Sequence, residues 1–269
     1  FQNTHEEINY DYVKEKKINV VRRNTGGGAV YHDLGNLNYS FIIPYVQSKI
    51  NFKTFTIPLV KELQSKGVNA EQTGRNDIVV DGQKFSGNAQ QFHNHKLLHH
   101  GTIMFDVHMD DVAKALNVKP GKFRSKATKS VRSRVINIKP LIEANNCDVN
   151  NIEDFKNLLL DWFEKEYELK KVELNREQEK EIETLRAEKY ASDEWNFGRS
   201  PKADIVRGDF FRCGQIVFNF VIDNHKIKET KITGDFFTRG DIESLEKSLE
   251  GVEYEKDCLL KVLQEADLE

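Results

Sequence analysis

Three consecutive glycines, Gly26 to Gly28, lie between two segments that have the composition of β-strands, residues 18–21 and residues 37–43. Because glycine has no Cβ, it adopts backbone conformations that other residues avoid and lets a ligand lie directly on the main chain. Arg22 and Arg23 precede the glycines, with two residues between, and add fixed positive charge beside backbone N–H groups. This combination suits a carboxylate or a phosphate. Three glycines alone would favour a simple turn between two strands.

The composition is typical of a folded globular protein. The chain has 269 residues, of which 38% are hydrophobic and 31% charged, and this length allows one large domain or two unequal ones. The net charge of −3 excludes no class of function. No apolar run approaches the roughly 20 residues that a membrane helix needs, and no signal-peptide pattern opens the chain. We therefore predict no membrane association.

The three cysteines, Cys147, Cys213 and Cys258, are widely spaced and form no CxxC pair. Their odd number and their spacing argue against a disulfide framework and against a zinc cluster. Both properties are consistent with a reducing compartment, so we predict a cytoplasmic protein.

Ordered motifs run through the chain. Residues 22–36 follow a pattern of two arginines, a variable residue, Ser or Thr, Gly-Gly-Gly-Ala-Val, an aromatic residue and His-Asp-x-Gly-Asn. This pattern resembles that of the lipoate–protein ligase family, and every fixed position is met. The resemblance covers nearly the whole chain, and its further segments are residues 74–77 with 84–89, 99–102, 129–135 and 195–198.

The resemblance implies an α+β fold. A large mixed-sheet domain of the biotin/lipoate ligase type would span residues 1–195, and a small C-terminal α+β accessory domain would span residues 196–269. Family members have a first strand and helix before the segment that Phe1 opens, so we expect the given sequence to be a piece of a longer protein. The junction at residues 198–201 resembles a hinge between the two domains.

The resemblance also implies the reaction: ATP and Mg²⁺ activate lipoate as lipoyl-AMP, and the lipoyl group passes to a lysine of a lipoyl domain. The acceptors would be acyltransferase subunits of 2-oxoacid dehydrogenases and the glycine cleavage H protein. The chain has no GxxxxGK[ST] motif and no GxGxxG followed by an acid, so neither a P-loop nor a Rossmann site is expected. We expect neither nucleic acid nor membrane as a partner.

Lys84 lies where the resemblance places the essential lysine of the family. Joining a carboxylate to the α-phosphate of ATP brings two anions together, and one ammonium between them offsets their repulsion. Arg23 should hold the same carboxylate or phosphate region as a rigid fork. On sequence alone, a lysine after a hairpin turn would most often be a solvated surface residue.

Further site residues follow from the same resemblance. Asn76 offers an amide to the adenine edge, and Asp77 is the candidate ligand for Mg²⁺; a simple turn at these two residues is the alternative. His100 would line the acyl tunnel or make a core hydrogen bond. The backbone positions expected to meet the nucleotide are Gly28, Ala29, Val30 and Tyr31.

A basic segment runs from Lys119 to Lys139, with eight Lys or Arg and no acid. A solvated loop is one interpretation, and nucleic-acid binding is another, although Phe123 is its only aromatic residue. The resemblance favours a loop, residues 119–134, that is mobile without ligand and closes over the adenylate.

Other activities remain possible on this fold. Octanoyl and lipoyl transferases use a nucleophilic cysteine, and no cysteine lies near the motifs. Biotin ligases run the same two half-reactions but usually carry Gly-Arg-Gly-Arg-x-Gly, which is absent here. A non-catalytic lipoate- or nucleotide-binding scaffold would bind without releasing pyrophosphate.

Local patterns predict the elements. Thr4 and Glu7 form a capping-box pattern for a short helix, and a strand should lead to Arg23. Pro58 lies inside a helical pattern, where it predicts a kink or a late start. Hairpin turns are expected at residues 81–82 and 94. Helices are expected at residues 52–63, 155–163, 173–194, 242–249 and 258–263, and strands at 37–43, 78–80, 210–213, 216–222 and 227–232.

Overall fold

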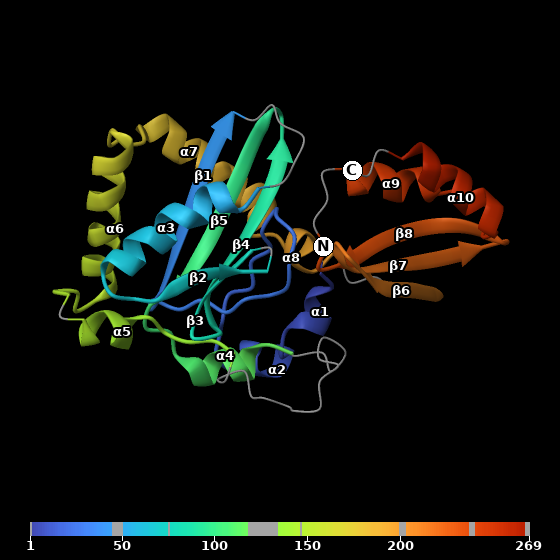
Figure 1. Ribbon diagram of the computed structural model, residues 1–269. Coiled ribbons are helices and arrows are strands. Elements are labelled where there is room, and N and C mark those ends of the chain that lie inside the picture. The colour runs from blue at the N-terminus through green and yellow to red at the C-terminus, as the bar shows by residue number, and fades with distance from the viewer. Residues whose placement is uncertain are drawn as a thin grey trace. The chain divides into compact units, whose positions relative to one another are not determined.

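The computed structural model forms two compact units, one made of residues 1–29 and 179–269 and the other of residues 30–178 (Figure 1). Each unit contains its own sheet and its own core. No helix among the described residues is long and apolar enough to cross a membrane. The structure describes residues 2–44, 51–74, 76–117, 134–145, 147–198, 203–236 and 240–266.

A five-stranded antiparallel sheet forms the centre of the unit 30–178, in the order β1-β5-β4-β3-β2. Both predicted hairpins are confirmed. Asp81 and Gly82 connect β3 to β4 with φ of 49° and 74°, and Asn94 and His95 connect β4 to β5 with φ of 47° and 56°. Positive φ at both central residues is the requirement of a tight two-residue turn. The strands are Asn36–Pro44 (β1), Ala70–Thr73 (β2), Asp77–Val80 (β3), Gln83–His93 (β4) and Lys96–Met104 (β5).

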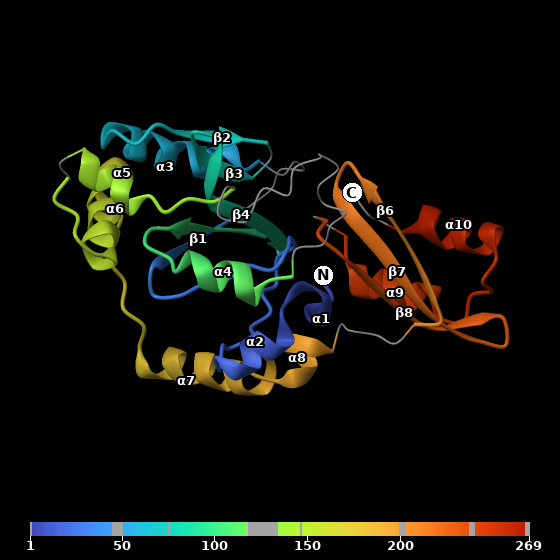
Figure 2. The ribbon, with the colours of Figure 1, turned by 90° about the horizontal axis from the view of Figure 1, so that it is seen from below.

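Two helices cover one face of this sheet: α3 (Lys53–Ser65) and α6 (Ile152–Tyr167) (Figures 1 and 2). Phe41 of β1 lies with its ring 5.6 Å from that of Phe55 and 5.7 Å from that of Phe163. The predicted helix over residues 52–63 is confirmed, with Gly67 in the left-handed region just past its end. A late start at Pro58 is wrong, because α3 begins at Lys53 and contains the proline.

The core beneath these helices buries Phe155 and Leu159 of α6, within the helix that the sequence predicts over residues 155–163. Phe105, just past β5, stacks on Phe155 of α6 with ring centroids 5.0 Å apart, and both side chains are buried. Two shorter helices, α4 (Met109–Ala115) and α5 (Lys139–Ala144), add to the same unit. The largest fully buried core side chains of this unit are Leu63, Ile78, Phe85, Ile103, Phe105, Ile138, Ile142 and Phe155.

The opposite face of the sheet follows from strand register. Side chains alternate along a strand, so residues next to one that faces the helices point the other way. Phe41 pairs with His99 and both face the helices, whereas the neighbouring pair Ser40 and His100 faces away. Ala89 of β4 pairs with His100 and lies on that second face. The His100 motif therefore reaches the face of the sheet that α3 and α6 do not cover.

The N-terminal segment differs from its prediction. Two short helices form, α1 (Thr4–Glu7) and α2 (Tyr10–Glu15), and the capping-box prediction is wrong. Asn3 occupies the N-cap position of α1, while the Thr4 hydroxyl donates to the carbonyl of Asn196. Because that hydroxyl is used in a long-range contact, it is not available to cap its own helix.

The predicted strand before Arg23 is also wrong: residues 18–23 form no β-ladder. Side chains of α8 (Asp193–Phe197) take the backbone groups instead. The Arg22 N–H donates to Asn196 Oδ1 at 2.8 Å, and Trp195 Nε1 donates to the Arg22 carbonyl at 2.9 Å. Backbone groups of a β-type sequence need partners, and here side chains supply them in place of another strand.

The C-terminal part of the chain contains the three predicted strands and two predicted helices, but its first strand spans Ile205–Phe211 rather than residues 210–213. A three-stranded antiparallel sheet, in the order β6-β7-β8, carries α9 and α10 on one face (Figure 1). Before it, the helix predicted over residues 173–194 is divided into α7 (Arg176–Leu185) and the π-helical turn η3 (Arg186–Tyr190), and neither contains a buried residue. The elements are Ile205–Phe211 (β6), Gly214–Asp223 (β7), Lys226–Gly234 (β8), Ile242–Leu249 (α9) and Lys256–Glu265 (α10).

Candidate active site

The glycine loop is built around the side chain of Arg23. Its Nε donates to Thr25 Oγ1 at 3.1 Å, and its Nη2 donates to the carbonyls of Gly26 at 2.7 Å and Gly28 at 3.0 Å. Burial lowers the pKa of Arg23 from its usual value, and the nearby Glu7 carboxylate acts against that shift. Nε and Nη2 are thus committed to shaping the loop, which adds a structural role to the ligand-binding role predicted for Arg23.

Arg22 has a different partner from Arg23. Its Nε donates to the Trp195 carbonyl at 3.0 Å, and its Nη2 donates to Thr4 Oγ1 at 2.6 Å. Together with its backbone bonds to α8, these contacts make Arg22 a clamp between the glycine-loop segment and that helix. The two adjacent arginines therefore have separate structural tasks, which their sequence alone does not distinguish.

Lys84 and Asp77 form an ion pair between β4 and β3, with Nζ 2.7 Å from Oδ1. Their side chains are 39% and 38% exposed, so the pair adds little to stability but remains accessible to a ligand. The Lys84 backbone is fixed on its other side, because its N–H donates to the Arg134 carbonyl at 2.7 Å and its carbonyl accepts from Ile136. The structure brings the predicted catalytic lysine and the predicted Mg²⁺ ligand together.

Gly87 provides the space in which the Lys84 side chain lies. A Cβ placed on Gly87 would be 2.9 Å from Lys84 Nζ and 3.0 Å from its Cε. The glycine three residues after the lysine therefore lets the ammonium lie close against the backbone of β4. This explains in physical terms why a lysine and a glycine belong in the same short motif.

Gly87→Ala is expected to displace the Lys84 ammonium and to slow the adenylation that the family resemblance implies by roughly 10- to 100-fold, since misplacement of about 1 Å can cost that much. Stability should fall by less than about 1 kcal/mol, because the end of a flexible lysine moves easily. Pyrophosphate release and thermal unfolding measure the two effects.

Gly101→Ala is the matched control for the effect of a glycine-to-alanine change on stability. A Cβ at this position would lie 2.3 Å from Asn88 Oδ1 on the helix-covered face. That variant should lose stability. A wild-type rate of pyrophosphate release in Gly87→Ala would contradict the conclusion that Gly87 provides the space in which the Lys84 side chain must lie.

Asn76 and Asn88 join the start of β3 to β4. Asn76 Nδ2 donates to the Asn88 carbonyl at 2.7 Å, and the Asn76 carbonyl accepts from the N–H and the Nδ2 of Asn88, both at 3.0 Å. The amide nitrogen predicted to meet adenine thus holds two strands together in this structure. Asn88 is a residue whose role the sequence reasoning missed, although it lies within the motif at residues 84–89.

His99 is the core histidine of the His-His pair. It is fully buried and stacks on Phe55 with ring centroids 4.5 Å apart. Gln90 Nε2 also donates to the Asn51 carbonyl, which fixes its orientation, so it donates to His99 Nδ1 at 2.9 Å. His99 Nε2 then carries the proton and donates to Asn88 Oδ1 at 3.2 Å. A core hydrogen bond is one of the two roles predicted for His100. In the structure, His99 is the histidine that makes such hydrogen bonds.

Burial, assisted by the neighbouring His100, lowers the pKa of His99 to about 3. The unfolded chain, with a histidine pKa of 6.5, binds this proton more readily than the folded chain does. The free energy of unfolding should therefore fall as the pH drops from 6.5 toward 3. Tyr39, which donates to Asn88 Oδ1 at 2.5 Å, also has a raised pKa because of its burial.

His99→Gln is expected to remove this acid sensitivity while keeping a donor and an acceptor in the core. Between pH 7 and pH 5 the wild-type protein should lose roughly 2 kcal/mol more unfolding free energy than the variant. Urea unfolding of both proteins at the two pH values measures the difference. Equal losses in the two proteins would show that His99 is not the titrating group.

The residues after the glycines connect the start of β1 to the start of α4 through hydrogen bonds of Asp33. Asp33 Oδ1 accepts from the Gly35 N–H and its Oδ2 accepts from the His108 N–H, each at 2.8 Å. Burial and the nearby carboxylates of Asp111 and Asp33 raise the pKa of Tyr31. Val30 is 53% exposed. The His-Asp-x-Gly portion of the motif is thus a structural element that fixes the chain as it enters β1.

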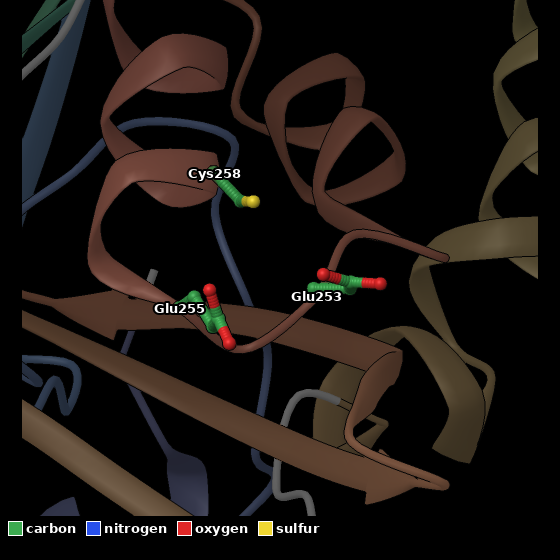
Figure 3. A group of neighbouring side chains, drawn as sticks. All are labelled: Glu253, Glu255 and Cys258. Atoms are coloured by element: carbon green, nitrogen blue, oxygen red, sulfur yellow. The ribbon is translucent and has the colours of Figure 1, made fainter.

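An open crevice of about 430 Å³ lies at the start of β1 and contains none of the predicted site residues. Among the described residues, the group whose side chains could share a metal ion is Glu253, Glu255 and Cys258, at and before the start of α10 (Figure 3). Both glutamates are exposed, and the group does not include Asp77. Cys147, Cys213 and Cys258 are present as thiols and not in disulfide bonds.

Sequence comparisons match both parts of the chain. The model of the family described as "Lipoyl protein ligase A/B catalytic domain" matches residues 1–164, and that of "Bacterial lipoate protein ligase C-terminus" matches residues 200–269. Lipoate–protein ligase 1 of Staphylococcus aureus is 44% identical over 99% of this chain and 80% of its own length. Lipoate-protein ligase LplJ of Bacillus subtilis is 44% identical over 99% of this chain and 81% of its own length.

Solved structures share the fold. LipL1 of P. falciparum in complex with lipoate has a TM-score of 0.75 at 28% identity and covers 100% of this chain and 78% of its own. A bipartite lipoate protein ligase from Thermoplasma acidophilum, studied with its E2 lipoyl domain, has a TM-score of 0.63 at 32% identity, covering 76% and 80%.

Lipoate-protein ligase A bound with ATP has a TM-score of 0.61 at 28% identity and covers 74% of this chain and 79% of its own. The family models match the α+β unit that holds Lys84 and the small sheet domain, and two curated relatives align over 99% of the chain. The chain therefore belongs to the lipoate–protein ligase family.

Proposed function

We propose that this chain carries out ATP-dependent ligation of lipoate to protein through a lipoyl-AMP intermediate. The observation that carries the proposal is the Lys84 ammonium, held 2.7 Å from Asp77 and seated against Gly87, within a chain of this family. The named relatives are lipoate–protein ligases, and two structural neighbours hold lipoate and ATP. Octanoate is the alternative acid, since it shares the carboxylate and the aliphatic chain of lipoate.

The first half-reaction joins two anions. A carboxylate oxygen of lipoate attacks the α-phosphorus of ATP, and the bond to the β-phosphate oxygen breaks, so pyrophosphate leaves with the electron pair. The Lys84 ammonium would lie between the carboxylate and the α-phosphate and offset their repulsion. The glycine loop, shaped by Arg23, would present backbone N–H groups to one of these anions.

The second half-reaction moves the acyl group. The amine of an acceptor lysine attacks the lipoyl carbonyl carbon, AMP leaves with the electrons of the broken C–O bond, and the amine releases its proton to solvent. The ammonium of Lys84 would stabilise the negative charge that develops on the acyl oxygen. No covalent acyl-enzyme intermediate is needed, and Cys147, Cys213 and Cys258 lie outside this chemistry.

Mg²⁺ is the metal that the family implies, and the residues present fit it. Asp77 offers a half-exposed carboxylate beside Lys84, and Mg²⁺ usually takes one or two carboxylates together with substrate phosphates. We propose that Asp77 holds the ion, which when bound neutralises phosphate charge. Asn76, Val30, Tyr31 and His100 are proposed as further residues of the nucleotide and acyl sites.

Proposed acceptors are apo lipoyl domains of 2-oxoacid dehydrogenase acyltransferase subunits and the glycine cleavage H protein, and the E2 lipoyl domain studied with the Thermoplasma acidophilum ligase supports that class. The cysteines, present as thiols, suit a cytoplasmic location. Residues 196–269 are proposed as the accessory domain. The predicted closing loop, up to Ser133, and the hinge at residues 199–201 lie outside the described residues.

The test is incubation of the full-length enzyme with lipoate, ATP, Mg²⁺ and an apo lipoyl domain, followed by intact mass spectrometry. The acceptor should gain one lipoyl group, and pyrophosphate should appear in equal amount. Replacement of lipoate by biotin should give no gain. A protein that binds lipoate and ATP but releases no pyrophosphate would be a scaffold, and the proposal would be wrong.

A further inference from the structure

Glu7 is a buried carboxylate that touches the glycine loop. Glu7 is the last residue of α1, and it is only 7% exposed. Oε2 accepts from the backbone N–H of Ala29 at 3.0 Å. The Gln2 amide satisfies its neighbours when its nitrogen faces Glu7, and Nε2 then donates to Glu7 Oε1 at 3.2 Å. Buried carboxylates are rare unless they are paired, so this arrangement requires an explanation.

Glu7 and Arg23 hold the same peptide unit from opposite sides. The Gly28 carbonyl accepts from Arg23 Nη2 at 3.0 Å, and the N–H of the same peptide, that of Ala29, donates to Glu7. In a planar trans peptide the C=O and N–H point in opposite directions. The Gly28–Ala29 peptide is therefore fixed in one orientation by a cation on one side and an anion on the other.

The charges of the two side chains also support one another. Desolvation of the Arg23 guanidinium is unfavourable, and the Glu7 carboxylate favours its charged form. Arg23 also holds the Gly26 carbonyl at 2.7 Å, so the planar Gly26–Gly27 peptide directs its N–H away from Arg23. Loss of Glu7 would release one peptide and leave the cation that orders the other less well compensated.

We propose that Glu7 is a positioning residue that, together with Arg23, fixes the peptides of the glycine loop so that the loop can bind the phosphates of ATP. The Ala29 N–H is occupied by Glu7 and does not itself face the ligand. This inference rests on the proposed function, because it assigns the loop to the nucleotide of that reaction. It also explains why a short helix near the start of the chain carries a buried acid.

The opposite interpretation makes the same contact inhibitory. A carboxylate on a backbone N–H resembles a bound anion, so Glu7 could occupy a place that a phosphate would otherwise take. The two interpretations differ in sign: removal of a positioning residue weakens ATP binding, whereas removal of an occluding anion strengthens it.

The test uses Glu7→Ala and Glu7→Gln in the full-length enzyme, with Glu6→Ala, on the exposed side of the same helix, as the matched control. A hydrogen bond to a charged group supports an expected rise of about 10- to 100-fold in the KM for ATP of Glu7→Ala. Glu7→Gln keeps an acceptor oxygen and should show a smaller rise. The kcat of both Glu7 variants at saturating ATP should stay near the wild-type value. The KM for ATP of Glu6→Ala should also stay near the wild-type value.

Equilibrium binding of ATP, with thermal unfolding in parallel, keeps the inference separate from the proposed reaction. Wild-type protein that binds ATP but releases no pyrophosphate would end the proposed function, while weaker ATP binding in Glu7→Gln would still support the positioning role. Unchanged or tighter ATP binding in folded Glu7→Gln would overturn it. If Glu7→Ala does not fold, the Glu7→Gln comparison decides the matter.

Discussion

Lys84→Ala is expected to lower the rate of lipoyl transfer to an acceptor domain by ~10²–10³, the usual effect of removing one donor that stabilises developing charge. The side chain is 39% exposed and its ion pair with Asp77 is accessible to solvent, so the free energy of unfolding should change by less than about 1 kcal/mol. Acceptor mass gain over time measures transfer, and urea unfolding measures stability.

Lys96→Ala is the matched control for this experiment. Lys96 is an exposed lysine on the adjacent strand β5, at the opposite end of β4 from Lys84, where it pairs with His93. Its variant should transfer lipoate at the wild-type rate. Wild-type transfer by Lys84→Ala, in a folded protein, would remove the lysine from the mechanism.

Phe105→Ala is expected to have the largest effect on stability, a loss of about 3–5 kcal/mol, because it removes a fully buried ring and leaves a cavity. Phe105 stacks on Phe155 at 5.0 Å in the core under the helix-covered face. The loss should appear in the urea midpoint. At low temperature the remaining folded protein should still form the adenylate, because Lys84, Asp77 and Gly87 lie elsewhere on the sheet.

Leu160→Ala, on the exposed side of α6, is the control for Phe105→Ala. Exposed positions away from caps and networks usually change stability by no more than about 0.5 kcal/mol. If Phe105→Ala lowered the free energy of unfolding by less than about 1 kcal/mol, the core between the sheet and the helices α3 and α6 would not be the main source of the protein's stability.

The sequence predicted elements best where the local signal and the tertiary structure agree. Asp81-Gly82 predicts a tight hairpin turn because Asp and Gly tolerate positive φ. Both residues have positive φ in the structure. The helix predicted over residues 155–163 and the strand predicted over residues 216–222 both form, and Phe155 and Phe220 lie in the two cores. These elements depend on neighbouring residues, which is what a sequence pattern records.

Predictions failed where a distant residue decides the structure. Thr4 does not cap its own helix because Asn196, far along the chain, accepts its hydroxyl proton. Residues 18–23 lack a strand because Trp195 and Asn196 satisfy the Arg22 backbone. No periodicity in either segment reports those partners, since they are separated by more than a hundred residues of sequence.

The candidate site shows the same division. The family resemblance implies that Lys84 and Asp77 belong to one site, and the structure pairs them directly. The roles of Gly87, Glu7 and Asn88 became clear only from geometry, because a seat for an ammonium, an anion on a peptide N–H and a strand-joining amide have no local pattern. The family resemblance identifies which residues are candidates for the chemistry, and long-range packing identifies what holds them.

The most direct test of the account is lipoate-dependent exchange of labelled pyrophosphate into ATP, measured for the wild-type enzyme and Lys84→Ala in the same assay. This exchange reports only the first half-reaction and needs no acceptor protein. We expect exchange in the wild-type enzyme that requires lipoate and falls by ~10²–10³ in the variant. No lipoate-dependent exchange in the wild-type enzyme, or equal exchange in both proteins, would contradict it.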